Sequence, residues 1–173
     1  MKTVLLLRHA KSAWNDAGLS DHERPLSRRG ERAAEALADY IAKKAPRPDL
    51  ILCSTAARTR QTLAPLVHRL AAPAPPILLE KGLYLAPEAT LLARLRKAPD
   101  DAGTVLLIGH NDGIGQLADA LAGSGPAEAL ASLHEKFPTG ALAILELDGP
   151  WSDLAPGQAR LVEFVRPRDL AVT

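Results

Sequence analysis

Three short runs of apolar residues constrain the fold of this chain more than any other feature of its sequence. They occupy residues 3–7 (TVLLL), 49–53 (DLILC) and 104–108 (TVLLI). None of them alternates between apolar and polar positions, and a short continuous apolar run is typical of a strand that is buried on both faces of a parallel sheet. The three runs therefore predict a parallel sheet with helices packed on both of its sides.

Segments with helical spacing lie between these runs. In residues 27–44, apolar side chains recur on one helical face from Ala33 to Ile41, and Ser27 is placed to cap the first turn. Further helices are predicted over residues 57–70, 88–97 and 114–121. Prolines punctuate the segments between the elements without a break large enough for a domain boundary.

Shorter apolar segments complete the sheet. They predict a fourth strand at residues 77–79 and two C-terminal strands, joined by a loop that contains Trp151, at residues 141–147 and 160–165. The sequence thus predicts a three-layer α/β/α fold with a mostly parallel central sheet and an antiparallel C-terminal edge. Residues 1–173 are expected to form one domain.

The composition excludes several classes of function. Of the 173 residues, 47% are hydrophobic and 24% are charged, as in globular domains. The formal net charge of +1 provides no basic field for nucleic acid or for an anionic membrane. The apolar start ends at Arg8, too early for a signal peptide, and no run approaches the roughly 20 residues of a membrane helix. The single cysteine excludes an intrachain disulfide, so a cytoplasmic location is expected.

Polar and charged residues follow directly after each of the three apolar runs. The first run leads into Arg8 and His9, the second into residues 54–58 (STAAR), and the third into residues 109–111 (GHN). In open α/β sheets ligands bind beyond the carboxyl ends of the strands, so parallel neighbours bring these clusters to one edge. Guanidinium groups match phosphate oxygens, and a neutral histidine is a nucleophile toward phosphorus. The combination predicts a site for a phosphoryl group.

Four ordered motifs are similar to those of the histidine phosphatase superfamily, which includes the cofactor-dependent phosphoglycerate mutases. R-H-G-x-S-x-W-N appears in residues 8–15 with Ala10 in place of glycine, and L-[ST]-x-x-G-x-x-A appears in residues 26–33. S-x-x-x-R-x-x-Q-T appears in residues 54–62, and G-H-N in residues 109–111. The resemblance implies a phosphoglycerate mutase-like fold.

Within this superfamily, the RHA triplet, the R-P-L triplet at residues 24–26 and the short chain resemble the SixA-type phosphohistidine phosphatases. The resemblance implies a metal-independent phosphatase that requires no cofactor. It also implies that His9 is the nucleophile and forms a transient phosphohistidine that water hydrolyses.

The same resemblance implies two groups of substrate-binding side chains. The first group binds the phosphoryl oxygens and stabilises charge as the phosphoryl group moves in line, and comprises Arg8, Arg58 and His110. The second group adds neutral contacts to the substrate and comprises Ser12, Asn15 and Asn111.

Three carboxylates are candidates for a general acid. Mutases of the superfamily carry a glutamate after a middle strand, and Glu80 lies at a similar place, which makes it the first candidate. Asp21 and Glu23, just ahead of residues 24–26, are alternatives. A phosphohistidine substrate has less need of an acid, because a protonated imidazole leaves more readily than an alkoxide. The alternative interpretation of Glu80 is a solvated charge at a strand end.

Other chemistries do not fit the spacing of the residues. Cysteine-dependent phosphatases require C-x5-R, but four residues separate Cys53 from Arg58 and six separate it from Arg60. No G-x-G-x-x-G, G-K-[ST] or H-E-x-x-H motif occurs, which argues against nucleotide loops and a zinc site.

Several remaining side chains are expected to lie outside the site. His22, His68 and His134 show no site spacing and are predicted to be surface residues. Trp14 is predicted to be a packing residue rather than a substrate contact. The charges at residues 28–32 fit two interpretations, the solvated start of a helix or a surface that steers a phosphoprotein.

The sequence therefore predicts a phosphatase that acts through a covalent phosphohistidine on His9, with phosphohistidine in a protein as the favoured substrate. A phosphatase for small phosphomonoesters is the first alternative, and a phosphate-binding module without turnover is the second. No long insertion is present that would enclose a small substrate, and this favours a protein side chain.

Overall fold

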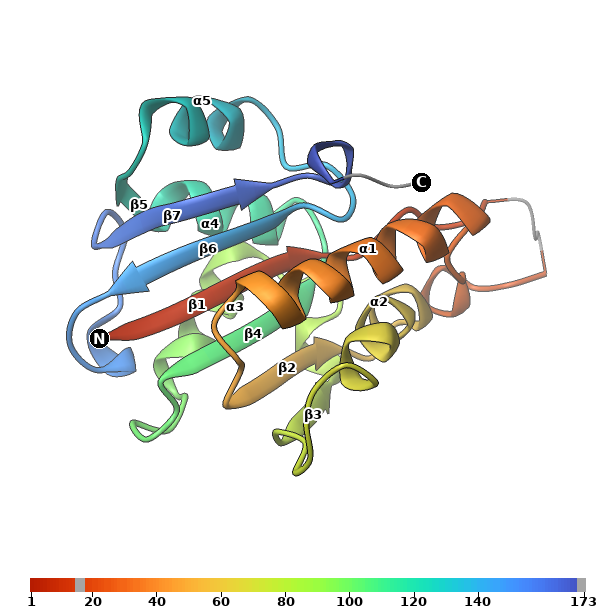
Figure 1. The fold of residues 1–173 in the computed structure, drawn as a ribbon, viewed down its shortest axis with the longest axis horizontal. Coiled ribbons are helices and arrows are strands. Elements are labelled where there is room, and N and C mark those ends of the chain that lie inside the picture. The colour runs from red at the N-terminus through yellow and green to blue at the C-terminus, as the bar shows by residue number, and fades with distance from the viewer. Residues whose placement is uncertain (15–17, 171–173) are drawn as a thin grey trace.

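The computed structural model describes residues 1–14 and 18–170, and within them seven strands form one sheet (Figure 1). The strands are β1 (Lys2–Arg8), β2 (Leu50–Ser54), β3 (Ile77–Glu80), β4 (Thr104–Gly109), β5 (Ala122–Ser124), β6 (Leu142–Leu147) and β7 (Ala159–Val165). Their order across the sheet is β3-β2-β4-β1-β6-β7-β5. The three strands with continuous apolar runs, β2, β4 and β1, are therefore neighbours at its centre.

The strand directions confirm a mostly parallel sheet with an antiparallel C-terminal edge. Parallel pairing joins β1 to β4, β4 to β2 and β2 to β3. Antiparallel pairing places β6 between β1 and β7. The short outer strand β5, parallel to β7, was not predicted, because its three residues (AGS) carry no apolar pattern.

Helices cover both faces of the sheet, as the three-layer prediction requires (Figure 1). They are α1 (Arg28–Lys44), α2 (Ala57–Val67), α3 (Glu88–Arg96), α4 (Gly113–Leu121) and α5 (Ala127–Glu135). Leu5 and Leu7 of β1 pack in one core with α1 and α2, whereas Leu6 packs in the other core with α3 and α4. This alternation follows from the period of two along a strand, so β1 is buried on both faces.

Three details differ from the predicted elements. Helix α2 ends at Val67, three residues earlier than predicted. Helix α5 was not predicted, because Leu133 is its one buried residue and leaves little apolar periodicity. The predicted loop around Trp151 folds back into the core, where the indole Nε1 donates to the carbonyl oxygen of Ala102 (2.7 Å).

The start of α1 packs against the chain that leaves β1, and this contact positions the site. The Ser27 hydroxyl accepts a hydrogen bond from the backbone N–H of Gly30 (3.0 Å), which confirms Ser27 as the cap. The backbone N–H of Ser27 donates to the carbonyl oxygen of Lys11 (2.9 Å). A Cβ atom on residue 30 would lie 1.9 Å from that same oxygen, so glycine is required there. In the part of the chain described, no helix has the length and apolar character needed to cross a bilayer.

Candidate active site

A pocket of about 510 Å³ lies beyond the carboxyl ends of β1, β2 and β4, and we refer to it as the strand-end pocket. It brings together six of the residues predicted from the sequence, namely Arg8, His9, Ser12, Arg58, His110 and Asn111. The predicted Asn15 lies outside the described residues. The rest of the lining comprises Lys11, Trp14, Asp21, Arg24, Leu85, Lys136, Pro138 and Thr139.

His9 is buried at 6% exposure and held in one tautomer. Its Nδ1 lies 2.6 Å from the carbonyl oxygen of Ala10. Because a carbonyl oxygen can only accept, the ring hydrogen is on Nδ1, and the lone pair of the neutral imidazole is on Nε2. Burial lowers the pKa of His9 to about 4, and the positive charges of Arg58 and Arg8 act in the same direction. The ring is therefore neutral at pH 7.

Three buried nitrogens around His9 have no hydrogen-bond partner. They are Nε of Arg8, Nε of Arg58 and Nδ1 of His110, and no other buried side-chain nitrogen or oxygen in residues 1–14 and 18–170 lacks one. Buried polar groups are almost always paired, so three orphans at one pocket indicate a place for a ligand rich in acceptor oxygens. Burial also lowers the pKa of His110 to about 3, with further contributions from His9 and Arg58.

Other atoms of these three side chains are fixed by neighbouring groups. Arg8 Nη1 donates to the carbonyl oxygen of Phe137 (3.0 Å), and His110 Nε2 lies 2.8 Å from the Ser54 hydroxyl. The amide of Asn111 donates to the same Phe137 oxygen (3.0 Å), and its oxygen accepts from the backbone N–H of Gly115 (3.0 Å). Asn111 thus holds the backbone of the pocket wall and also lines the pocket, and its contact with substrate stays a prediction.

The motif ending in Gln61-Thr62 holds the backbone next to His9. The Thr62 hydroxyl accepts from the backbone N–H of Ala10 (3.0 Å), and the Gln61 side chain accepts from that of Leu26 (2.9 Å). The methyl group of Ala10 is buried with Leu26 and Ala34. An alanine in place of the motif's glycine is therefore accommodated by packing.

Asp21 lies in the pocket and is surrounded by donors. Its carboxylate accepts from the Tyr84 hydroxyl, from Arg58 Nη2 (3.0 Å), and from Arg24 Nε and Nη2 (3.1 and 3.0 Å). Burial alone raises the pKa of Asp21, but these hydrogen bonds outweigh it and hold the pKa well below its usual range. Tyr84 was not predicted, because it follows a short 3-10 turn after β3 and belongs to no motif.

Comparison with known proteins identifies the family. The sequence profile of the histidine phosphatase superfamily (branch 1) matches residues 4–83. The solved structure of a protein from Agrobacterium tumefaciens, provisionally named phosphohistidine phosphatase SixA, shares 35% identity with a TM-score of 0.80, covering 96% of this chain and 98% of that one. The chain belongs to the histidine phosphatase superfamily. Its similarity to SixA places it in the SixA-type branch.

Two further relatives of this histidine phosphatase match nearly the whole chain. A second structure, from Nakamurella multipartitia and also provisionally named phosphohistidine phosphatase SixA, shares 32% identity with a TM-score of 0.80, covering 96% of each chain. The Mycobacterium tuberculosis protein Rv1276c, named as uncharacterized, is 42% identical over 164 residues, 94% of this chain and 100% of the relative. The chain is thus a phosphatase with a histidine nucleophile that acts on a phosphorylated substrate.

The other predicted acids of this histidine phosphatase lie elsewhere. Glu80 does not line the strand-end pocket, and its carboxylate accepts from Arg94 Nε (2.7 Å) and Nη2 (3.0 Å). Glu23 is also absent from the lining and pairs with Nδ1 of His22 (3.0 Å). Of the three candidates, Asp21 alone lines the pocket.

Two aromatic or imidazole side chains differ from their predicted environments. The prediction that Trp14 is a packing residue is wrong, because it is 78% exposed at the pocket with the Arg24 guanidinium 3.5 Å from its ring centroid. His22 was predicted to be a surface residue, but it is half-buried. Its Nε2 lies 2.8 Å from the Thr55 hydroxyl, and its ring meets the edge of Tyr84 at 4.8 Å between centroids.

Cys53 is unsuited to nucleophilic chemistry. The thiol is buried in the core of the sheet, outside the strand-end pocket. Burial raises its pKa to about 12, so the reactive thiolate is not formed at pH 7.

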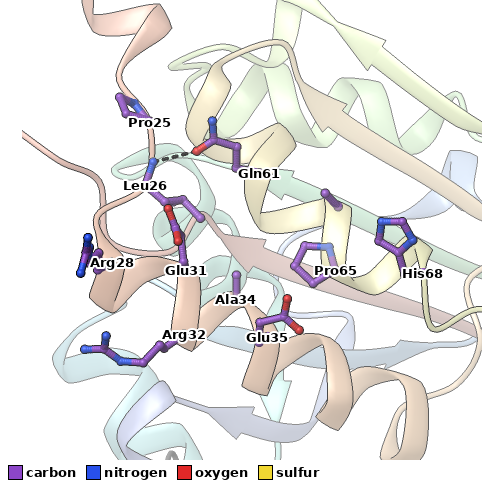
Figure 2. A pocket seen from close by; sticks show the side chains of 11 residues that line it. Pro25, Leu26, Arg28, Glu31, Arg32, Ala34, Glu35, Gln61, Pro65 and His68 are labelled. Carbon is purple, nitrogen blue, oxygen red and sulfur yellow. Dashed lines mark hydrogen bonds between the residues drawn. The ribbon is translucent and has the colours of Figure 1, made fainter.

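A larger pocket of about 830 Å³ lies between α1 and α2, and we call it the helix groove (Figure 2). The hydrogen bond between Gln61 and Leu26 lies in its wall (Figure 2). It shares no lining residue with the strand-end pocket, and none of the unpartnered buried nitrogens belongs to it. Its lining comprises Pro25, Leu26, Arg28, Glu31, Arg32, Ala34, Glu35, Gln61, Ala64, Pro65 and His68.

Proposed function

We propose that this histidine phosphatase removes the phosphoryl group from phosphohistidine in a protein, with Nε2 of His9 as the nucleophile. The observation that carries the proposal is the set of buried unpartnered nitrogens on Arg8, Arg58 and His110 around a histidine whose Nδ1 is already used. Three donors suit the three non-bridging oxygens of a phosphoryl group. The fixed tautomer of His9 leaves the Nε2 lone pair for phosphorus.

In the first step, the Nε2 lone pair of His9 forms a bond to phosphorus while the bond from phosphorus to the leaving nitrogen breaks. The electron pair of that bond goes to the leaving imidazole, which takes a proton from solvent. Arg8 and Arg58 stabilise the charge on the phosphoryl oxygens as the group moves in line. The hydrogen bond from Nδ1 to the Ala10 carbonyl stabilises the positive charge that develops on the His9 ring.

In the second step, water attacks the phosphorus of phospho-His9, and the bond from phosphorus to Nε2 breaks. The electron pair returns to Nε2, the second proton of the water passes to solvent, and inorganic phosphate leaves with the added hydroxyl group. The two guanidinium groups again bind the oxygens. Nε2 of His110 lies 2.8 Å from the Ser54 hydroxyl. We assign the hydroxyl as the donor in this pair, which places the ring hydrogen of His110 on Nδ1 for the phosphoryl group.

Two observations support phosphohistidine over an ordinary ester. Asp21 is the one carboxylate among the described lining residues, and its low pKa keeps it ionised, so it does not supply a proton. An imidazole leaving group needs less acid catalysis than an alkoxide. Around the buried His9, the exposed Trp14 and Leu85 leave an open pocket that suits a side chain on a protein surface.

Hydrolysis of phosphohistidine peptides, measured against a panel of small phosphate esters, tests the proposal. We expect kcat/KM to be highest for the phosphohistidine peptide, and the His9→Ala variant to lose hydrolysis of every substrate. Cys53→Ser is the matched control, since it changes a buried nucleophile outside the pocket, and it should retain activity. Faster turnover of a small sugar or nucleotide-like ester would favour the small-molecule alternative. Equal rates for wild type and His9→Ala would contradict the proposal.

A further inference from the structure

The acceptor capacity of the Asp21 carboxylate is fully used. An ionised carboxylate offers about four lone-pair positions. Oδ1 accepts from two nitrogens of Arg24, and Oδ2 accepts from Arg58 Nη2 and from the Tyr84 hydroxyl. A carboxylate bound in this way has neither a proton to give nor a free lone pair for a substrate. Asp21 therefore has a role in the pocket other than acid catalysis.

Asp21 fixes the guanidinium of Arg58 at two points. Arg58 Nη2 donates to the Asp21 carboxylate (3.0 Å), and Arg58 Nη1 donates to the carbonyl oxygen of the same residue (2.7 Å). Arg58 is 3% exposed, and its Nε is the nitrogen left without a partner. A guanidinium held at both Nη atoms cannot rotate, so the direction of its Nε–H is set by Asp21.

Tyr84 connects this pair to the second histidine of the pocket. Its hydroxyl donates to Asp21, and its ring forms a T-shaped pair with the His110 ring at 5.4 Å between centroids. The Arg58 guanidinium lies 5.9 Å from the Tyr84 ring centroid. On the other side of the carboxylate, Arg24 donates through Nη1 to the Ser12 hydroxyl (2.9 Å). One carboxylate thus links groups from four separate segments around the pocket.

We propose that Asp21 is a positioning residue that acts through Arg58, with Tyr84 as its supporting donor, and that it is not the general acid of the reaction. The inference rests on the proposed role of Arg58 as a ligand of the phosphoryl oxygens. Small errors in the placement of such a group are costly, because displacements of about 1 Å can reduce a rate by about 10²-fold.

A series of substituted phenyl phosphates with leaving groups of increasing pKa separates positioning from acid catalysis. Asp21→Asn places an amide donor against two arginines, and we expect kcat/KM to fall by about 10- to 100-fold, by the same factor for every ester. A general acid would instead give a loss that grows with the pKa of the leaving group. A loss of that kind, or no loss at all, would overturn the proposal.

A double-mutant cycle tests whether Asp21 acts through Arg58. In the Arg58→Ala background, Asp21→Asn should change kcat/KM by less than about threefold, because the group it positions is absent. If the loss of kcat/KM in the double variant equals the product of the two single losses, Asp21 has a role that does not involve Arg58. That result would overturn the proposal. Wild type and His9→Ala are measured in the same series. An active wild type and an inactive His9→Ala support the proposed function, whatever the result for Asp21.

Tyr84→Phe keeps the test decisive if Asp21→Asn does not fold. It removes one hydroxyl donor and retains the ring against His110, so we expect a uniform loss of about three- to tenfold across the esters. Asp169→Asn is the matched control for Asp21→Asn. Asp169 is also bound by the Nε and Nη2 atoms of an arginine, Arg166, but lies outside the strand-end pocket, so kcat/KM should stay unchanged. Unchanged activity in Tyr84→Phe would contradict its assigned support of Asp21.

Discussion

The strand-end pocket and the helix groove are both concave, yet they differ in what their walls offer a ligand. The helix groove is the larger, at about 830 Å³ against about 510 Å³. Most of its lining residues lie on α1 and α2. The lining carboxylate of Glu35 pairs with Arg69 (2.7 Å). The strand-end pocket instead contains the buried nitrogens without partners and two histidines with lowered pKa values.

Unsatisfied donors, rather than volume, therefore support the strand-end pocket as the proposed active site. A buried N–H without an acceptor costs free energy, so such groups persist where a ligand satisfies them. The strand-end pocket contains three such N–H groups, because β1, β2 and β4 end at the same edge of the sheet and their polar residues follow there. The groove between α1 and α2 has no comparable convergence.

The largest expected contrast is between an arginine of each pocket. Arg58→Ala removes a buried guanidinium that we propose binds the phosphoryl oxygens, and it should reduce kcat by about 10³-fold. Arg32→Ala removes an exposed arginine that lines the helix groove and should change kcat by less than about twofold. Steady-state kinetics with one substituted phenyl phosphate measures both. A comparable loss in Arg32→Ala would break the contrast between the pockets.

The free energy of unfolding should depend strongly on the contact between α1 and the chain that leaves β1. Gly30→Ala places a Cβ 1.9 Å from the Lys11 carbonyl oxygen and should lower the free energy of unfolding by about 3 kcal/mol. Gly82→Ala meets nothing within 4 Å and serves as the matched control. Denaturant titration measures both variants. Equal free energies of unfolding for the two would contradict the packing at Gly30.

The pH dependence of stability should come from the strand-end pocket. The pKa of His9 is lowered in the folded state to about 4 from an ordinary value of 6.5, so below pH 6.5 the unfolded chain binds more protons than the folded one. The stability contributed by neutral His9 is present above pH 6.5 and is lost as the pH falls toward 4, by about 3 kcal/mol. Denaturant titration at several pH values, compared with His9→Gln, measures this term. A variant with the same pH slope as wild type would contradict it.

The smallest effect concerns two positions on opposite sides of α2. Thr62→Val leaves the backbone N–H of Ala10 without its acceptor and should cost about 2 kcal/mol of stability, together with part of the activity. Ala64→Ser, on the exposed side that lines the helix groove, should change stability by less than about 0.5 kcal/mol. Thermal and denaturant unfolding distinguish the two. Unchanged stability in Thr62→Val would contradict the importance of the hydrogen bond that joins α2 to the backbone next to His9.

Local sequence pattern predicted the centre of this fold well. Continuous apolar runs identified β1, β2 and β4, and the residues at their ends meet in one pocket as the parallel arrangement requires. The same reasoning failed for β5 and α5, which bury few side chains and so carry little periodicity. Their positions depend on contacts with β7 rather than on their own sequence.

The surroundings of the site were less predictable than its centre. Sequence position ranked Glu80 ahead of Asp21 as the candidate acid. Tertiary contacts reverse that order, since Glu80 pairs with Arg94 outside the pocket and Asp21 pairs with Arg58 within it. Tyr84 had no signal, because its contact with Asp21 joins residues 63 positions apart. Pairing of this kind depends on tertiary geometry, which spacing along the chain does not encode.

The most direct test of the account is to identify the phosphorylated intermediate. Enzyme mixed rapidly with phosphohistidine peptide and quenched in base, where phosphohistidine survives, is analysed by peptide mass spectrometry and ³¹P NMR. We expect one phosphoryl group on Nε2 of His9, and none in His9→Ala. Because Nδ1 is held by the Ala10 carbonyl, phosphate on Nδ1 would contradict the assigned tautomer. Phosphate on another residue, or turnover without any phosphorylated enzyme, would contradict His9 as the nucleophile.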